Sequence, residues 1–238
     1  MSPDHFHTTR WTRVLAARGN SPEARQALSD LCALNYAPVL RFLRAAGHPP
    51  DEAQDLAHGF FAQVLAHHSL DGADRGRGRF RSYLLGALKH FASAQRQRDA
   101  RLKRGAGLER ESLDTDTAAG VATVPEALRT EPPDAVFDRE WALAIIDRAV
   151  TALGVESAAS GSSAVFEALK PCLSTSTTTP LHAETAEGLG MSEGALRVAL
   201  HRLRKRFREL VRGAVLETVQ DETELEGEMQ HLIKALAE

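Results

Sequence analysis

The chain is poor in cysteine and in aromatic residues, and it has no long apolar run. Its two cysteines, Cys32 and Cys172, stand far apart and outside any metal-ligand spacing, which argues against a disulfide framework and a cysteine-based zinc site. The first residues have no apolar core of the kind found in secretory signals, and no run approaches the roughly 18 residues that span a bilayer. These absences predict a cytoplasmic protein that makes no contact with a membrane.

Signatures of enzymes and metalloproteins are also missing. The ten histidines form no HExxH-like pair. No glycine-rich phosphate loop follows a strand-like segment, and no nucleophile stands beside a plausible base. We therefore expect no catalytic site, no metal and no cofactor.

Helix-forming residues dominate the composition. Aromatic residues make up only 5% of the chain, whereas Ala, Leu, Arg and Glu are abundant. Hydrophobic residues at 43% and charged residues at 26% are typical of a folded domain. The composition predicts an all-α protein.

Positive charge is concentrated in two stretches, although the formal net charge is only −3. Residues 75–110 hold eleven basic and two acidic side chains, and residues 193–213 hold seven basic and two acidic side chains. Two basic islands in an otherwise acidic chain favour nucleic-acid binding over a generally solvated surface.

Apolar periodicity divides the chain into two small helical domains. Helical patterning covers 8–104 and resumes at 134–215, with a soft break expected at 154–163. Between them, 105–133 reads as a flexible linker rich in Gly, Ala, Thr, Asp and Pro. Residues 216–238 form an amphipathic helix whose apolar face carries Leu225, Met229, Leu232, Ile233 and Leu236. This helix is expected to extend the C-terminal core or to shield the basic domain beside it.

The segment 183–207 carries the sharpest pattern, that of a helix-turn-helix. Gly190 can take the left-handed conformation that ends a first helix, and Ser192 can cap a second. One buried face of that second helix is predicted from Leu196, Leu200, Leu203, Phe207 and Leu210. The opposite faces would meet DNA, with Arg197 as the leading base contact. The full predicted DNA-binding set is Ser192, Glu193, Arg197, His201, Arg202, Arg204 and Lys205.

Three stretches together resemble sigma-70 family factors of the extracytoplasmic-function type. PPDEAQDLAHGFFAQVL and GRFRSYLLGALKHFASAQRQRDARLKR resemble their region two, and LGMSEGALRVALHRLRKRFREL resembles their region four. FHTTRWTRVLAA, FDREWA and the acidic C-terminal helix resemble a longer subgroup of these factors. The resemblance covers residues 8–212. It departs from the common pattern at Tyr83, at His90 and at the pair His58-Gly59.

The resemblance implies a dissociable subunit that brings bacterial core RNA polymerase to promoters. A docking helix would contact a coiled coil of the largest subunit through Asp51, Glu52, Asp55, His58 and Gln63. The minus-ten element would be melted and held by the loop and helix from His67 to Arg98, with Arg79, Phe80, Arg81, Tyr83, Lys89, His90 and Arg96 as candidates. The helix-turn-helix would read the minus-thirty-five element, near the polymerase flap region. An anti-sigma protein or a Ser/Thr kinase is a further candidate partner.

Two other interpretations remain open from the sequence. A free-standing helix-turn-helix regulator would bind duplex DNA without polymerase, usually as a dimer. A scaffold or anti-factor would imitate one sigma domain without starting transcription. The basic glycine-rich loop before residue 80 speaks against the first, and the reduced acidity of the docking helix is the only support for the second.

Overall fold

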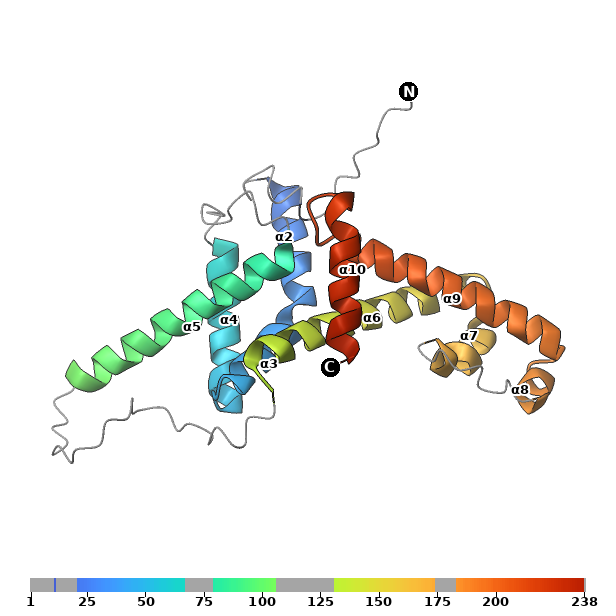
Figure 1. Cartoon of the computed structure of the whole chain (residues 1–238), viewed down its shortest axis with the longest axis horizontal. Coiled ribbons are helices and arrows are strands. Elements are labelled where there is room, and N and C mark those ends of the chain that lie inside the picture. Colours follow the sequence, from blue (N-terminus) through green and yellow to red (C-terminus); the bar gives the residue numbers. More distant parts are fainter. Residues whose placement is uncertain (1–10, 12–20, 67–78, 106–130, 174–182, 238) are drawn as a thin grey trace, which may run out of the picture. The chain divides into compact units, whose positions relative to one another are not determined.

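The structure, a computed structural model, describes residues 11, 21–66, 79–105, 131–173 and 183–237. These residues are helical apart from turns and one isolated antiparallel bridge, which confirms the predicted all-α class (Figure 1). The helices are α2 (Pro22–Leu34), α3 (Tyr36–Ala45), α4 (Pro50–Ala66), α5 (Phe80–Gly105), α6 (Pro133–Ala159), α7 (Ser163–Leu169), the short 3₁₀ helix η3 (Lys170–Cys172), α8 (Ala183–Gly188), α9 (Glu193–Leu216) and α10 (Glu222–Ala237). None of them is long and apolar enough to cross a membrane.

The chain forms two compact units whose limits differ from the predicted domains. The first unit contains residues 1–142 together with 218–238, and the second contains 143–217. The start of α6 and the whole of α10 therefore belong with the N-terminal helices. Residues of the segment 131–142 and of the C-terminal segment 218–237 contact α5 and Arg79, the residue before it.

Local sequence signals set the helix starts in the first unit. Ser21 accepts a hydrogen bond from the main-chain N–H of Ala24 and so caps α2, which has Pro22 at its first position. Pro50 similarly begins α4, with Asp51 and Glu52 in the first turn at the positive end of the helix dipole.

The core of the first unit is formed by α2 to α5 and the start of α6. Its largest fully buried side chains include Trp11, Phe60, Phe80 and Phe137. Trp11 contacts the ring of Phe80 edge-on, with centroids 5.1 Å apart. Phe60 and Phe80 are thus core residues of the first unit.

The second unit is built on α9. Leu169, Ala186, Leu196 and Leu200 form one buried cluster, and Leu153, Phe166 and Leu173 form another. Leu203, Phe207 and Leu210 pack against the second cluster, so the predicted apolar face of α9 is confirmed.

The predicted break at 154–163 was wrong for its first half, because α6 continues to Ala159. A Cβ atom at Gly154 would lie 3.1 Å from the ring of Phe166. Glycine at this position therefore allows α7 to approach α6 closely and does not end the helix. The predicted linker lies outside the described residues over 106–130, as does the glycine-rich loop over 67–78.

Candidate nucleic-acid interface

A tight turn joins α8 to α9. Gly190 has φ +64°, and the N–H groups of Met191 and Gly190 donate to the carbonyls of Ala186 and Glu187, both at 2.9 Å. These two bonds are a Schellman motif, which satisfies the last carbonyls of α8. Ser192 then accepts a 3.2 Å hydrogen bond from the N–H of Ala195 and caps α9. The predicted turn and cap are confirmed.

The first turns of α9 present polar side chains to solvent on the side away from the buried leucines. Of the predicted DNA-binding set, Ser192, Glu193, Arg197, His201, Arg202 and Lys205 are exposed. Arg197 leaves 68% of its side chain open and donates to Glu193, one turn earlier, at 3.1 Å. An exposed pair of this kind contributes only about 0.3–0.5 kcal/mol, so Arg197 can exchange Glu193 for another acceptor.

Two arginines of α9 contact other helices of the second unit. Arg204 is half-buried, and its Nε and Nη2 donate to the carbonyl of Cys172 at 3.1 and 2.9 Å. Arg206 pairs with Glu156 of α6 and with Glu209, and its hydrogen bond to Glu156 lowers the pKa of the Glu156 carboxyl. Arg204, predicted to contact DNA, is therefore engaged by the protein's own backbone.

The first three candidates for the minus-ten element, Arg79, Phe80 and Arg81, contact the C-terminal segment 218–237. Phe80 is fully buried, and its N–H donates to the carbonyl of Thr218 at 2.9 Å. Arg79 forms an antiparallel bridge with Val219. The side chain of Arg81 is only 8% exposed. Phe80 and Arg81 are thus withdrawn from the surface, whereas Arg79 keeps 34% of its side chain exposed.

Both arginines converge on Glu228 of α10, which is completely buried. Arg81 Nε lies 2.8 Å from Glu228 Oε1, and Arg79 Nη1 lies 3.2 Å from Oε2. Arg81 also donates to Asp138 of α6 at 2.7 Å, and its guanidinium lies 5.3 Å from the centre of the Trp141 ring. Two carboxylates thus compensate one deeply buried guanidinium.

His231 of α10 completes this network. Its Nε2 lies 3.0 Å from Asp138 Oδ2, and its ring is 6.1 Å from that of Trp141. Burial raises the pKa of the Asp138 carboxyl, but the contacts with His231 and Arg81 outweigh it, so the pKa lies below its ordinary value. Asp138 is therefore a stable anion at neutral pH.

Of the remaining four candidates on α5, one is half-buried and three are exposed. Tyr83 is half-buried against Trp11, with ring centroids 5.5 Å apart, and burial raises the pKa of its hydroxyl. Lys89 pairs with Asp134 in the first turn of α6. His90 and Arg96 are exposed.

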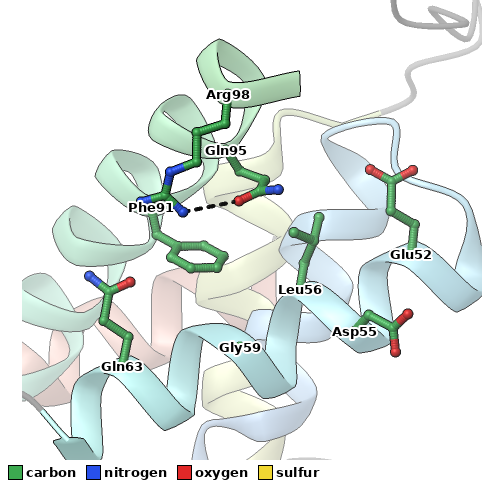
Figure 2. Close-up of a pocket in the computed structure, with 8 residues that line it drawn as sticks. All are labelled: Glu52, Asp55, Leu56, Gly59, Gln63, Phe91, Gln95 and Arg98. Carbon is green, nitrogen blue, oxygen red and sulfur yellow. Dashed lines mark hydrogen bonds between the residues drawn. The ribbon is translucent and has the colours of Figure 1, made fainter. Parts of the chain in front are cut away.

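A groove of about 630 Å³ separates α4 from α5 in the first unit (Figure 2). Leu56, Gly59 and Phe91 are its apolar lining, and a Cβ at Gly59 would lie 3.7 Å from the Phe91 ring. Its polar residues are Glu52, Asp55, Gln63, Gln95 and Arg98. Three of the five predicted polymerase-binding residues, Glu52, Asp55 and Gln63, are thereby brought together.

Asp51 and His58, the other two predicted polymerase-binding residues, do not line this groove. Asp51 is exposed in the first turn of α4. His58 Nε2 lies 2.9 Å from the hydroxyl of Tyr36 on α3, and the two rings stack. His58 therefore makes a polar contact with α3 and is not part of the groove.

Sequence reasoning missed Glu228, Asp138 and Asp134 as partners of the basic α5. The predicted apolar face of α10 was partly wrong, because Ile233 and Leu236 are exposed. The buried stripe is Leu225, Glu228, Leu232 and Ala235. A glutamate in phase with buried leucines was the available signal, since a carboxylate on such a face needs a cation beside it.

Comparison with known proteins gave no match to any family model, curated protein or solved structure. Among the described residues, no group of three or more His, Cys, Asp and Glu side chains could hold a metal ion.

Proposed function

We propose that this chain is an alternative sigma factor. It binds bacterial core RNA polymerase, and its α8–α9 pair reads the minus-thirty-five element. The observation that carries the proposal is the open polar face of α9, which begins at the Ser192 cap and is backed by buried leucines. A helix held in this way can enter the major groove with Arg197 at base edges and Arg202 and Lys205 at phosphates.

The groove between α4 and α5 supports a second attachment, to the polymerase. Its apolar lining and the carboxylates of Glu52 and Asp55, which outnumber the one cation of its described lining, Arg98, suit a helical partner with a basic face. This proposed docking agrees with the resemblance of α4 to part of sigma region two. A free-standing regulator has no need of such a groove, which is why we favour the sigma proposal over that alternative.

Copurification with core polymerase tests the groove. Asp55→Lys places a cation at the rim and should lower the amount of core polymerase retained by the tagged chain. Asp147→Lys makes the same charge change at an exposed position of α6 and should retain it fully. Equal retention by both variants would remove the groove from the proposal, and no retention by the native chain would remove the sigma function.

Duplex binding tests α9 separately. The native chain should select a discrete DNA sequence, and Arg197→Ala should relax the selection at one base pair. Selection of DNA without any retention of polymerase would favour the free-standing regulator.

A further inference from the structure

We infer that Thr218–Ala237 is a removable cover over Arg79 and Arg81, and that Glu228 occupies the place of a DNA phosphate. The inference rests on the proposed function, since it concerns the surface assigned to the minus-ten element. It makes the C-terminal segment a competitor of nucleic acid for the same two arginines.

The chemistry of the Glu228 contact is that of an oxyanion site. One carboxylate accepts from Arg81 Nε at 2.8 Å, from Arg81 Nη2 at 3.4 Å and from Arg79 Nη1 at 3.2 Å. Arginine forks recognise carboxylates and phosphates in the same bidentate way. A phosphodiester oxygen can therefore replace the Glu228 carboxylate without leaving either guanidinium unpaired.

The fit of the cover is specific. A Cβ at residue 227 would stand 2.8 Å from Arg79 Nη2, so glycine lets that guanidinium lie against α10. The Phe80 N–H to Thr218 bond and the Arg79–Val219 bridge hold the start of the same segment. All three contacts fall on the residues that the minus-ten element would need.

The cover has an apolar face of its own, because Val219, Leu225, Leu232 and Ala235 are buried. The buried apolar cluster that contains Trp11, Phe80 and Leu84 includes no side chain beyond Phe137. Its described links to α5 are ion pairs, a main-chain hydrogen bond and a bridge, all of which an incoming nucleic acid or water can replace. Lifting it leaves the cluster around Trp11 and Phe80 in place and exposes Val219, Leu225, Leu232 and Ala235, whose burial the contacts with nucleic acid must offset.

The experiment uses the full chain and a short fluorescein-labelled single-stranded oligonucleotide of mixed sequence. Glu228→Gln weakens the competitor, and Glu222→Gln makes the same change at an exposed site of α10. By fluorescence anisotropy, Glu228→Gln should bind at least about tenfold tighter than the native chain, while Glu222→Gln should match it. Gly227→Leu, which crowds Arg79 and removes no charge, should act in the same direction as Glu228→Gln.

Hydrogen exchange of the native chain gives an independent reading. Saturating oligonucleotide should speed amide exchange over residues 222–237, and the helical far-UV circular dichroism of each variant checks that it is folded. Unchanged affinity in both Glu228→Gln and Gly227→Leu, with α10 still protected when the oligonucleotide is bound, would overturn the inference. So would failure of every form to bind.

Polymerase retention, measured on the same proteins, separates the two proposals. Retention without any change in oligonucleotide affinity makes the C-terminal segment a fixed part of the fold and leaves the sigma function standing. Tighter oligonucleotide binding by Glu228→Gln without retention supports the cover and contradicts the sigma function.

Discussion

The two basic stretches of this chain look alike in sequence and differ in structure. On α9, Arg197, Arg202 and Lys205 are exposed, and Arg197 pairs with a glutamate one turn away. At the start of α5, Arg79 and Arg81 meet the fully buried Glu228, which lies 147 residues from Arg81 in the sequence. Local acids leave a cation accessible, whereas distant acids from another helix can cover it.

If the proposed function is right, this difference separates two ways of controlling a DNA-binding surface. The α9 face would bind duplex DNA directly, because the weak Arg197–Glu193 pair opens at little cost. Arg79 and Arg81 would bind only after Glu228 and Asp138 have been replaced as their partners. We therefore expect mutations of the Glu228 network to change both stability and nucleic-acid binding, and mutations of the α9 face to change DNA binding.

The largest effect should come from removing Glu228. Glu228→Ala leaves Arg79 without its partner and Arg81 with Asp138 alone, and breaking a buried pair in this way costs about 3–5 kcal/mol. The free energy of unfolding, followed by the fluorescence of Trp11 and Trp141, should fall by that amount. Glu222→Ala at an exposed position should change it by no more than about 0.5 kcal/mol. A loss below about 1 kcal/mol for Glu228→Ala would mean that the ion-pair network does not stabilise the fold.

On α9 the effect should fall on DNA binding. Arg197→Ala should cost about 1–3 kcal/mol of discrimination at one base pair, without affecting stability. Lys205→Ala should weaken binding to all duplexes alike and lower the salt slope by about 1. Binding titrations at several salt concentrations measure both quantities. Equal behaviour of the two variants would contradict the division into base and phosphate contacts.

The start of α9 offers a smaller effect. Ser192→Ala removes the cap and should lower the free energy of unfolding by about 1 kcal/mol, with weaker duplex binding because Arg197 lies one turn further on. Ser192→Asp retains a capping oxygen and serves as the control. Full stability of Ser192→Ala would show that the Schellman turn alone fixes the helix start.

The smallest effect is a pH dependence of the α5 network. The Asp138 pKa is depressed in the folded chain, so its stabilisation is present above the ordinary pKa of an aspartate and is lost as pH falls through the folded value. Acid titration of the Trp141 fluorescence should show this step in the native chain. In Asp138→Asn the step should disappear, and its persistence there would assign it to another group.

Sequence reasoning succeeded where the cause is local. Gly190, Ser192 and the leucines of α9 follow rules that span one or two helical turns, and each was predicted in its observed place. The prediction of a break starting at Gly154 was wrong, because glycine is needed there to make room for the ring of Phe166 on another helix.

The contacts of Arg79 and Arg81 could not be predicted from local sequence rules. Arg81 pairs with residues 57 and 147 positions away, and no periodicity connects them. Of the candidate docking residues, Glu52, Asp55 and Gln63 share the groove because they lie on one face of α4. His58 turns to Tyr36 instead, a contact that depends on how α3 packs.

Run-off transcription with purified bacterial core polymerase and a genomic DNA library tests the central claim most directly. The sigma proposal predicts new, discrete start sites when the native chain is added, and their loss with Arg197→Ala. Unchanged transcription by core polymerase, from a chain that nonetheless binds duplex DNA, would contradict it.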